Sequence, residues 1–168
     1  MITGPPGAGK STVSRALAGT FPFGMHIPID DLREWVAGGM AHPLGWSDET
    51  TRQYELAEDA AAEIARRYRR AGFAVVLDHC TMPPRLEAWL ARTEFGEPLR
   101  RVMLLPSLEA TRGRNLARVV KDFDTAVLDP HIPNIHRAFA EMDAGGWEVI
   151  DTTEDTVERT VERIRALG

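Results

Sequence analysis

Residues 4–11 read GPPGAGKS and match the pattern G-x-x-x-x-G-K-[ST] at every fixed position. Residues 1–3 before this stretch look like the tail of an apolar strand. After it comes a helix whose apolar face carries Val13, Ala16 and Leu17. A chance match in a chain of 168 residues is expected in fewer than roughly one sequence in a hundred. The stretch therefore predicts a phosphate-binding loop (P-loop) between a strand and a helix.

The residue types of this loop suit a nucleoside triphosphate with Mg²⁺. Glycines allow positive φ and close backbone approach, so successive N–H groups can wrap a phosphate at a helix N-terminus. Lys10 is expected to reach the β and γ phosphates, and the Ser11 hydroxyl is expected to ligate Mg²⁺. The predicted nucleotide-binding residues are Gly4, Gly7, Ala8, Gly9, Lys10, Ser11 and Thr12. The sequence contains no guanine-reading N-K-x-D segment, so ATP is the expected nucleotide.

Apolar runs and helical stripes alternate along the rest of the chain. Further strands are expected at 26–29, 73–77, 101–105 and 147–150, and further helices at 32–36, 49–71, 83–95, 108–123, 132–142 and 156–167. The run at 73–77 is apolar throughout, as in a parallel strand covered on both faces. This order predicts an α/β fold with a parallel five-stranded sheet flanked by helices, and a ligand at the C-terminal ends of the strands.

The first strand is unusually short in this scheme. Only three residues precede Gly4, whereas strands usually have about five or six. We expect either that the natural polypeptide begins upstream of Met1 or that a clipped strand pairs at some cost in stability.

Length and composition limit the class of protein. The 168 residues suit a single domain, 1–168, and 43% hydrophobic with 27% charged residues is typical of soluble globular proteins. No stretch approaches the ~20 apolar residues of a membrane span, and no secretory signal is evident, so a cytoplasmic location is expected. The single Cys80 agrees with a reducing compartment and is expected to be a packing residue. A net charge of −5 argues against sequence-blind binding of nucleic acid.

Carboxylates follow two of the predicted strands. Asp30 and Asp31 come after the second strand and Asp78 after the third, so they are expected to face the P-loop. A carboxylate there can accept a hydroxyl proton as a phosphoryl group departs. Asp31 could equally cap the following helix, so Asp30 is the better candidate for the base. Asp30 could alternatively bind Mg²⁺. Asp78 is interpreted as a Walker-B-like acid that holds Mg²⁺, with a loop-capping residue as the alternative. The histidines, His79 among them, have no metal-like spacing and no visible nucleophile partner.

Arg33 and the stretch at 40–47 are candidates for the acceptor side. Arg33 lies one helical turn after Asp30 and could pair with it, grip an acceptor phosphate, or simply be a surface residue. The stretch at 40–47 contains Pro43 and Gly45 and is expected to be a loop beside this site. Trp46 could line a pocket there, although tryptophan more often packs.

A second group of basic residues lies on the helix predicted at 108–123. Arg114, Arg118 and Lys121 share one side of that helix, and Leu116, Val119, Val120 and Phe123 share the other. A basic face toward phosphate and an apolar face inward is the pattern of a lid helix over a triphosphate. A solvated basic face would give the same pattern. We expect the lid at about 107–131.

Several segments resemble the small P-loop kinases of the nucleoside/shikimate-kinase type. This group includes the kinase domain of phage polynucleotide kinase, gluconate kinase, shikimate kinase, chloramphenicol phosphotransferase and zeta toxins. The similar segments are GPPGAGKST at 4–12, IDDLR at 29–33, LDHCTMPPRLEAW at 77–89 and RGRNLAR at 112–118. The chain departs from the family pattern at His79-Cys80, where Thr-Asn is usual, and at Leu32, where an aromatic residue is usual.

The resemblance implies roles for individual residues. Asp30 would be the general base, Arg33 would position the nucleophile or an acceptor phosphate, and Asp78 would be an acceptor-side acid. Arg114 and Arg118 would be the lid arginines, and Thr152 falls where related kinases place adenine. The implied function is an ATP- and Mg²⁺-dependent kinase for a hydroxyl of a polynucleotide 5′ end or a small molecule. The alternative is a nucleotide-dependent ATPase switch or binding protein, which would need no acceptor-side base.

Overall fold

The five strands of the chain form one parallel sheet in the order β2-β3-β1-β4-β5. The computed structural model describes residues 1–41, 45–93, 95, 99–117 and 128–167. The strands are β1 (Ile2–Thr3), β2 (Gly24–Pro28), β3 (Ala74–Asp78), β4 (Val102–Leu104) and β5 (Glu148–Ile150). The predicted α/β fold with a five-stranded parallel sheet is therefore confirmed.

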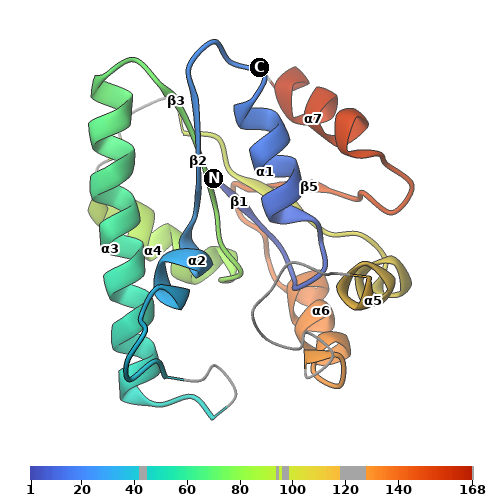
Figure 1. Cartoon of the computed structure of the whole chain (residues 1–168). Coiled ribbons are helices and arrows are strands. Elements are labelled where there is room, and N and C mark those ends of the chain that lie inside the picture. Colours follow the sequence, from blue (N-terminus) through green and yellow to red (C-terminus); the bar gives the residue numbers. More distant parts are fainter. Residues whose placement is uncertain (42–44, 94, 96–98, 118–127, 168) are drawn as a thin grey trace.

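Helices cover both faces of this sheet (Figure 1). They are α1 (Lys10–Ala18), α2 (Ile29–Glu34), α3 (Asp48–Arg70), α4 (Pro83–Thr93), α5 (Leu108–Leu116), α6 (Ile132–Glu141) and α7 (Val157–Ala166). Because successive strand residues point to opposite faces, Val76 packs in a core with α1 and α7, while Leu77 packs in a core with α3, α4 and α6. Both faces of the central strands are thus buried, which explains the continuous apolar run at 73–77.

The first strand lies in the middle of the sheet. Ile2 is opposite Asp78 of β3 and Val102 of β4, and Thr3 is opposite Met103. Because β1 ends directly at Gly4, this pairing places the P-loop between the C-terminal ends of β3 and β4.

The helix expected at 32–36 begins earlier than predicted. It is α2, it starts at Ile29, and its N-terminal flanking residue is Pro28, which makes no side-chain cap. Pro28 still pairs with Asp78, although proline has no N–H with which to extend a ladder of hydrogen bonds. This pairing is tolerated because β2 is an edge strand. Asp30 and Asp31 therefore lie in the first turn of α2 and not in a loop before it. The interpretation of Asp31 as the helix cap is wrong.

The other described helices begin near the predicted positions, and α3, α5 and α7 have a side-chain cap at the N-terminus. The Ser47 hydroxyl accepts from the Thr50 N–H, with a reciprocal bond from the Ser47 N–H, and so fixes the start of the long helix α3. Ser107 and Thr156 cap α5 and α7 in the same way. These caps fix the helices whose N-terminal ends face the P-loop side of the sheet. Among the described residues, no helix has the length and apolar content needed to cross a membrane.

Candidate active site

The P-loop runs from β1 into α1, and its glycines are required by both conformation and packing. Gly4 and Gly7 have φ angles of 146° and 85°, a region that favours glycine. A Cβ atom on Gly4 would lie 2.2 Å from the carbonyl oxygen of Leu104, and one on Gly7 would lie 2.3 Å from that of Thr111. The loop is therefore packed against the end of β4 and against α5, with no space for a side chain at either position.

Lys10 and Ser11, the first residues of α1, face the centre of this loop. The Lys10 side chain is buried, and its Nζ donates to the carbonyl oxygen of Pro5 at 3.1 Å, so the ammonium group folds back over the loop. The Ser11 hydroxyl donates to Oδ1 of Asp78 at 3.0 Å. The roles of Lys10 in phosphate contact and of Ser11 in metal binding stay predictions.

Asp78 is the last residue of β3 and is only 2% exposed. Its second carboxylate oxygen, Oδ2, lies 2.5 Å from Nε2 of His26 in β2. Mg²⁺ prefers oxygen ligands, so the hydroxyl of Ser11 and the carboxylate of Asp78 fit such an ion. The contact from His26 fixes the orientation of the carboxylate, and nothing in the sequence pattern had indicated it.

Asp30 lies in the first turn of α2, with its side chain 26% exposed. Its Oδ1 lies 2.9 Å from Nδ1 of His79 and accepts from the thiol of Cys80 at 3.3 Å. Burial alone would raise the pKa of Asp30, but the charges and hydrogen bonds of His79, Lys10 and Cys80 outweigh it and hold that pKa well below its usual range. Asp30 is therefore a carboxylate, and the charge of Lys10 is one of the causes that lower its pKa. The predicted packing role of Cys80 is incomplete, because its thiol has this polar contact.

His79 connects Asp30 to a buried carboxylate on α3. Its Nε2 lies 3.1 Å from Oε1 of Glu58, which is 1% exposed and also pairs with Arg85 at 3.1 Å. Burial opposes the charged imidazole, but Asp30, Cys80 and Glu58 together raise the pKa of His79 well above its ordinary value. Ligand atoms of Asp30, His79 and Cys80 lie within 4.8 Å of one another. A metal ion would need an unprotonated imidazole nitrogen, so the two carboxylates on His79 argue against one there.

Arg33 is a buried residue, and its interpretation as a surface residue is wrong. Its side chain is 6% exposed, its Nη1 donates to the carbonyl oxygen of Ala41 at 2.7 Å, and its Cζ lies 4.7 Å from the centre of the Tyr54 ring. Gln53 holds the same segment, since its amide accepts from the N–H of Ala41 and donates to the carbonyl oxygen of Gly39. Arg33 thus helps to hold the residues after α2 against α3.

A cavity of about 510 Å³ lies on the other side of the P-loop. It is lined by Gly7, Ala8, Gly9, Lys10, Ser11, Thr12, Val13, Arg114, Thr152, Asp155, Thr156, Val157, Glu158 and Thr160. All predicted P-loop residues except Gly4 contribute to it, together with Arg114 and Thr152. The residues at 155–160 were missed by sequence reasoning, although their place after the last strand and at the start of a helix was a usable signal.

Arg114 and Thr152 are in direct contact at the edge of this cavity. Arg114 Nη2 donates to the carbonyl oxygen of Thr152 at 2.7 Å, and its Nη1 donates to the Thr152 hydroxyl at 3.3 Å. The structure therefore brings the predicted lid arginine to the predicted adenine-side residue. Arg118 lies outside the described residues. Leu116 was expected to face inward, but it is 59% exposed, and α5 instead buries Thr111 and Asn115.

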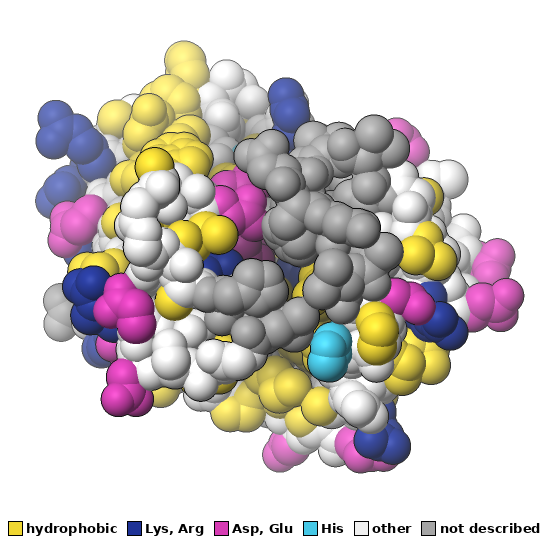
Figure 2. Space-filling model, turned by 60° about the horizontal axis from the view of Figure 1, so that its bottom comes forward, with side chains coloured by type: hydrophobic (Ala, Val, Ile, Leu, Met, Phe, Trp, Pro, Cys, Tyr) yellow, Lys and Arg dark blue, Asp and Glu magenta, His cyan; other side chains and the backbone are white. Residues whose placement is uncertain are grey.

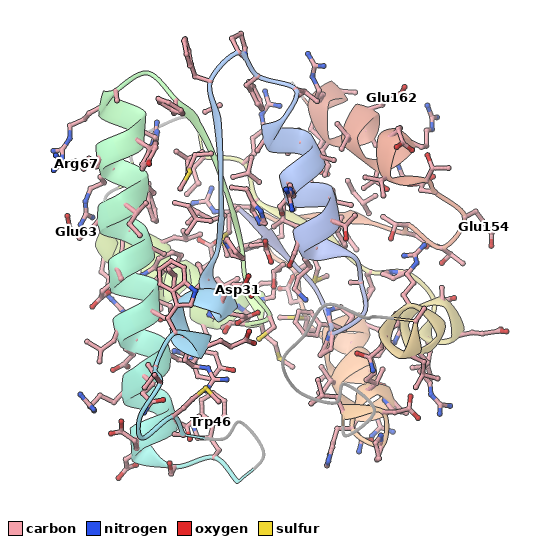
Figure 3. The ribbon with its side chains drawn as sticks, viewed as in Figure 1. Asp31, Trp46, Glu63, Arg67, Glu154 and Glu162 are labelled. Carbon is pink, nitrogen blue, oxygen red and sulfur yellow. The ribbon has the colours of Figure 1, made fainter. Side chains whose placement is uncertain are left out.

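The site thus has two halves on either side of the P-loop. Figure 2 shows the end of the molecule at the C-terminal ends of the strands, where acidic and basic side chains are visible beside residues outside the described ranges. In Figure 3, Asp31 on α2 and Glu154 before α7 mark the two sides. The cavity lies on one side of the P-loop, and Asp30 is not among the residues that line it.

The chain is similar to known proteins. The family model described as AAA domain matches residues 1–141. An adenylyl-sulfate kinase of Myxococcus xanthus (strain DK1622) is 25% identical over 169 residues, which cover 90% of this chain and 88% of that protein.

Solved structures share the fold at lower identity. A sugar kinase from Janibacter sp. HTCC2649 has a TM-score of 0.65 at 17% identity, with 98% of this chain and 90% of that chain covered. The tunicamycin resistance protein of Deinococcus radiodurans has a TM-score of 0.63 at 19% identity, with 99% and 92% covered. The fold is thus that of the small P-loop kinases.

Proposed function

Because this chain belongs to the AAA domain family and carries a P-loop domain of the kinase type, we propose that it is an ATP-dependent kinase with an alcohol acceptor. The observation that carries the proposal is the carboxylate of Asp30, which lies in the first turn of α2 and contacts His79, the residue after Asp78. A nucleotide switch has no use for such a group, whereas a kinase needs a carboxylate to orient the attacking hydroxyl. In this proposal residues 1–168 are one kinase domain with a lid at about 107–131, acting in the cytoplasm.

The donor side would be formed by the P-loop and the cavity beside it. The N–H groups at the start of α1 and the ammonium group of Lys10 would hold the β and γ phosphates, and Thr152 with Arg114 would lie beside the adenine. Ser11 and Asp78 are the residues that would hold Mg²⁺, which when bound neutralises charge on the β and γ oxygens. Arg118 would add positive charge from the lid.

Asp30 would act on the acceptor through one particular oxygen. Both hydrogen bonds that the described residues make to this carboxylate end on Oδ1, so Oδ2 is the oxygen able to receive the hydroxyl proton. The low pKa of Asp30 suits a late proton transfer, because the hydroxyl becomes acidic only as its oxygen bonds to phosphorus. Before that point the carboxylate orients the nucleophile.

The test is ATP turnover with and without a panel of hydroxyl-bearing acceptors. Nucleosides, 5′-OH oligonucleotides, sugars and antibiotic alcohols are incubated with γ-labelled ATP, and label on the acceptor is measured. We expect transfer to at least one acceptor and its loss in Lys10→Ala. ADP formation that is indifferent to every acceptor would contradict the proposal and favour a nucleotide-dependent switch.

A further inference from the structure

A second cavity lies at the end of the sheet away from the P-loop, where β1 begins. It has a volume of about 390 Å³. Residues 74–76 of β3 line one side of it, Leu99 and Arg100 before β4 line the other side, and Met1 and Ile2 lie between them. The cavity is therefore a gap between two strands of the sheet, in line with β1. We call it the strand gap.

The register of the sheet shows that β3 extends beyond the start of β1. Ile2 is opposite Asp78, so Met1 is level with Leu77, and residues 74–76 of β3 have no counterpart in the described part of β1. On its other edge β3 pairs with β2 along its whole length. Three residues before Met1 would match the length of β3 and would give β1 the usual strand length of about five or six residues.

Backbone N–H groups of β3 point into the strand gap. The N–H of His79 donates to the carbonyl oxygen of Ile2, toward β1. Because successive N–H groups of a strand point to opposite sides, the N–H groups of Leu77 and Val75 also face this side. Leu77 is only 3% exposed, and a buried N–H group needs an acceptor. In a parallel ladder the acceptors for these two groups would be carbonyl oxygens of residues before Met1.

The nitrogen of Met1 already has a place in the ladder with β4. It donates to the carbonyl oxygen of Arg100 at 2.7 Å, and the carbonyl oxygen of Met1 accepts from the Val102 N–H at 3.0 Å. A residue inside a parallel strand makes this same pair of bonds with its neighbour. As a terminal ammonium group the nitrogen is costly to bury, and burial together with the charge of Arg101 lowers its pKa to about 5. An amide N–H would donate the same bond without a charge.

We propose that the strand gap holds a continuation of β1, an extended apolar segment of three residues joined to the nitrogen of Met1. A separate peptide in line with β1 would end in a carboxylate against this buried nitrogen, whereas a joined segment has an uncharged peptide bond there. Because the P-loop follows β1 directly, the continuation would attach that loop to more of the sheet. The inference goes beyond the proposed kinase function and does not depend on it.

The two cores define which way each added side chain would point. Ile2 packs in the core with α1 and α7, and Met1 packs in the core with α3, α4 and α6. Because side chains alternate along a strand, the first and third residues before Met1 would face Leu17 and Ile164, and the second would face Leu99. These neighbours are apolar, so the segment is expected to be apolar at each position, as in a strand covered on both faces.

The first experiment measures thermal unfolding of three chains. One begins at Met1, one carries Val-Val-Val before Met1, and the control carries Gly-Ser-Gly, which also moves the ammonium group but adds no apolar side chain. The Val-Val-Val chain should unfold at least about 4 °C above the chain that begins at Met1, since apolar side chains become buried. The Gly-Ser-Gly chain should gain less than half of that. No gain from Val-Val-Val, or an equal gain from Gly-Ser-Gly, overturns the inference.

The second experiment locates the added strand by amide hydrogen exchange, resolved residue by residue with NMR. In the Val-Val-Val chain, exchange at Leu77 and Val75 should slow at least about tenfold more than at Val76, whose N–H points toward β2 and serves as the internal control. A change by the same factor at all three amides would reflect stability alone and would overturn the inference.

The third experiment determines the N-terminal peptide of the natural polypeptide by mass spectrometry. We expect at least three residues before Met1, with apolar side chains at the three positions next to it. A natural polypeptide that begins at Met1, or that has charged residues at these positions, overturns the inference. None of the three measurements involves phosphoryl transfer, so their outcome is independent of whether the chain is a kinase.

Discussion

Nδ1 of His79 lies 2.9 Å from Oδ1 of Asp30, and the imidazole between Asp30 and Glu58 has no exposed surface. His79, the residue after Asp78, therefore orients the proposed base Asp30. His79 stands where threonine is usual in the small P-loop kinases that this chain resembles. We therefore expect effects of substitutions at His79 as well as at the residues that sequence motifs identify.

Lys10→Ala should lower phosphoryl transfer at least about a hundredfold, because the ammonium group follows charge that develops on the transferring phosphate. The loss of one hydrogen bond to Pro5 should leave the fold intact. Steady-state transfer assays and the thermal unfolding midpoint measure the two effects. Normal transfer by the variant would disprove the P-loop assignment.

Asp30→Asn should lower transfer at least about a hundredfold while nucleotide affinity changes little, because the carboxylate acts on the acceptor hydroxyl. Asp31→Asn, in the same helical turn, is the matched control and should stay within a few-fold of the wild type. Transfer rates and calorimetric nucleotide titration separate the effects. Equal losses of transfer and of Mg²⁺-nucleotide binding would instead make Asp30 chiefly a metal ligand.

Asp78→Asn should raise the Mg²⁺ concentration for half-maximal transfer about tenfold or more, since removing a ligand or its supporting contact weakens metal sites to that extent. The measurement is a MgCl₂ titration of initial rates. Asp155→Asn, across the nucleotide cavity, is the control. An unchanged Mg²⁺ dependence would remove Asp78 from the proposed metal site.

His79→Asn should destabilise the protein by about 1–3 kcal/mol, because buried Glu58 loses a donor, and should lower kcat while the KM for ATP is kept. Urea unfolding and steady-state kinetics measure these effects. If His79 acts through Asp30, the loss of transition-state stabilisation in the double variant His79→Asn/Asp30→Asn should be smaller than the sum of the two single losses. The difference should be about 0.5–3 kcal/mol. Strict additivity would reduce His79 to a structural residue.

Arg118→Ala should lower the transfer rate more than it weakens nucleotide binding, since an arginine on transferring charge acts mainly in the transition state. Residues 108–131 should become more protected from hydrogen exchange when an unhydrolysable ATP analogue binds, because phosphate oxygens would offset the repulsion between the basic side chains of this stretch. Unchanged protection together with a normal rate would identify an ordinary surface segment.

The donor half of the site could be predicted because local rules determine it. The glycine pattern specifies the loop, and the C-terminal ends of neighbouring parallel strands meet at one edge. For this reason Ser11 and Asp78 were placed together although they are 67 residues apart. The helix boundaries near Pro28 were less predictable, because a strand can pass directly into a helix without a side-chain cap.

The support of the acceptor half could not be predicted, because it depends on burial of charged residues. Glu58 looks like a solvent-facing residue of a polar helix, and the partners His79, Arg85 and Arg92, which follow β3, make its burial tolerable. Arg33 is similar, since the Tyr54 ring that covers it comes from a different helix. Pairings of this kind appear only when the elements are assembled.

The central position of β1 has a consequence for synthesis on the ribosome. Ile2 pairs with Asp78 and Val102, and the loop that follows rests on Leu104 and Thr111, so β1 must wait for partners that are translated much later. At translation rates of about 5–20 residues per second, that wait is several seconds. Meanwhile the long helix α3 can form from local contacts alone. In the proposed function, ATP would bind only chains that have passed this point, and it would stabilise the completed sheet by mass action and not its precursors.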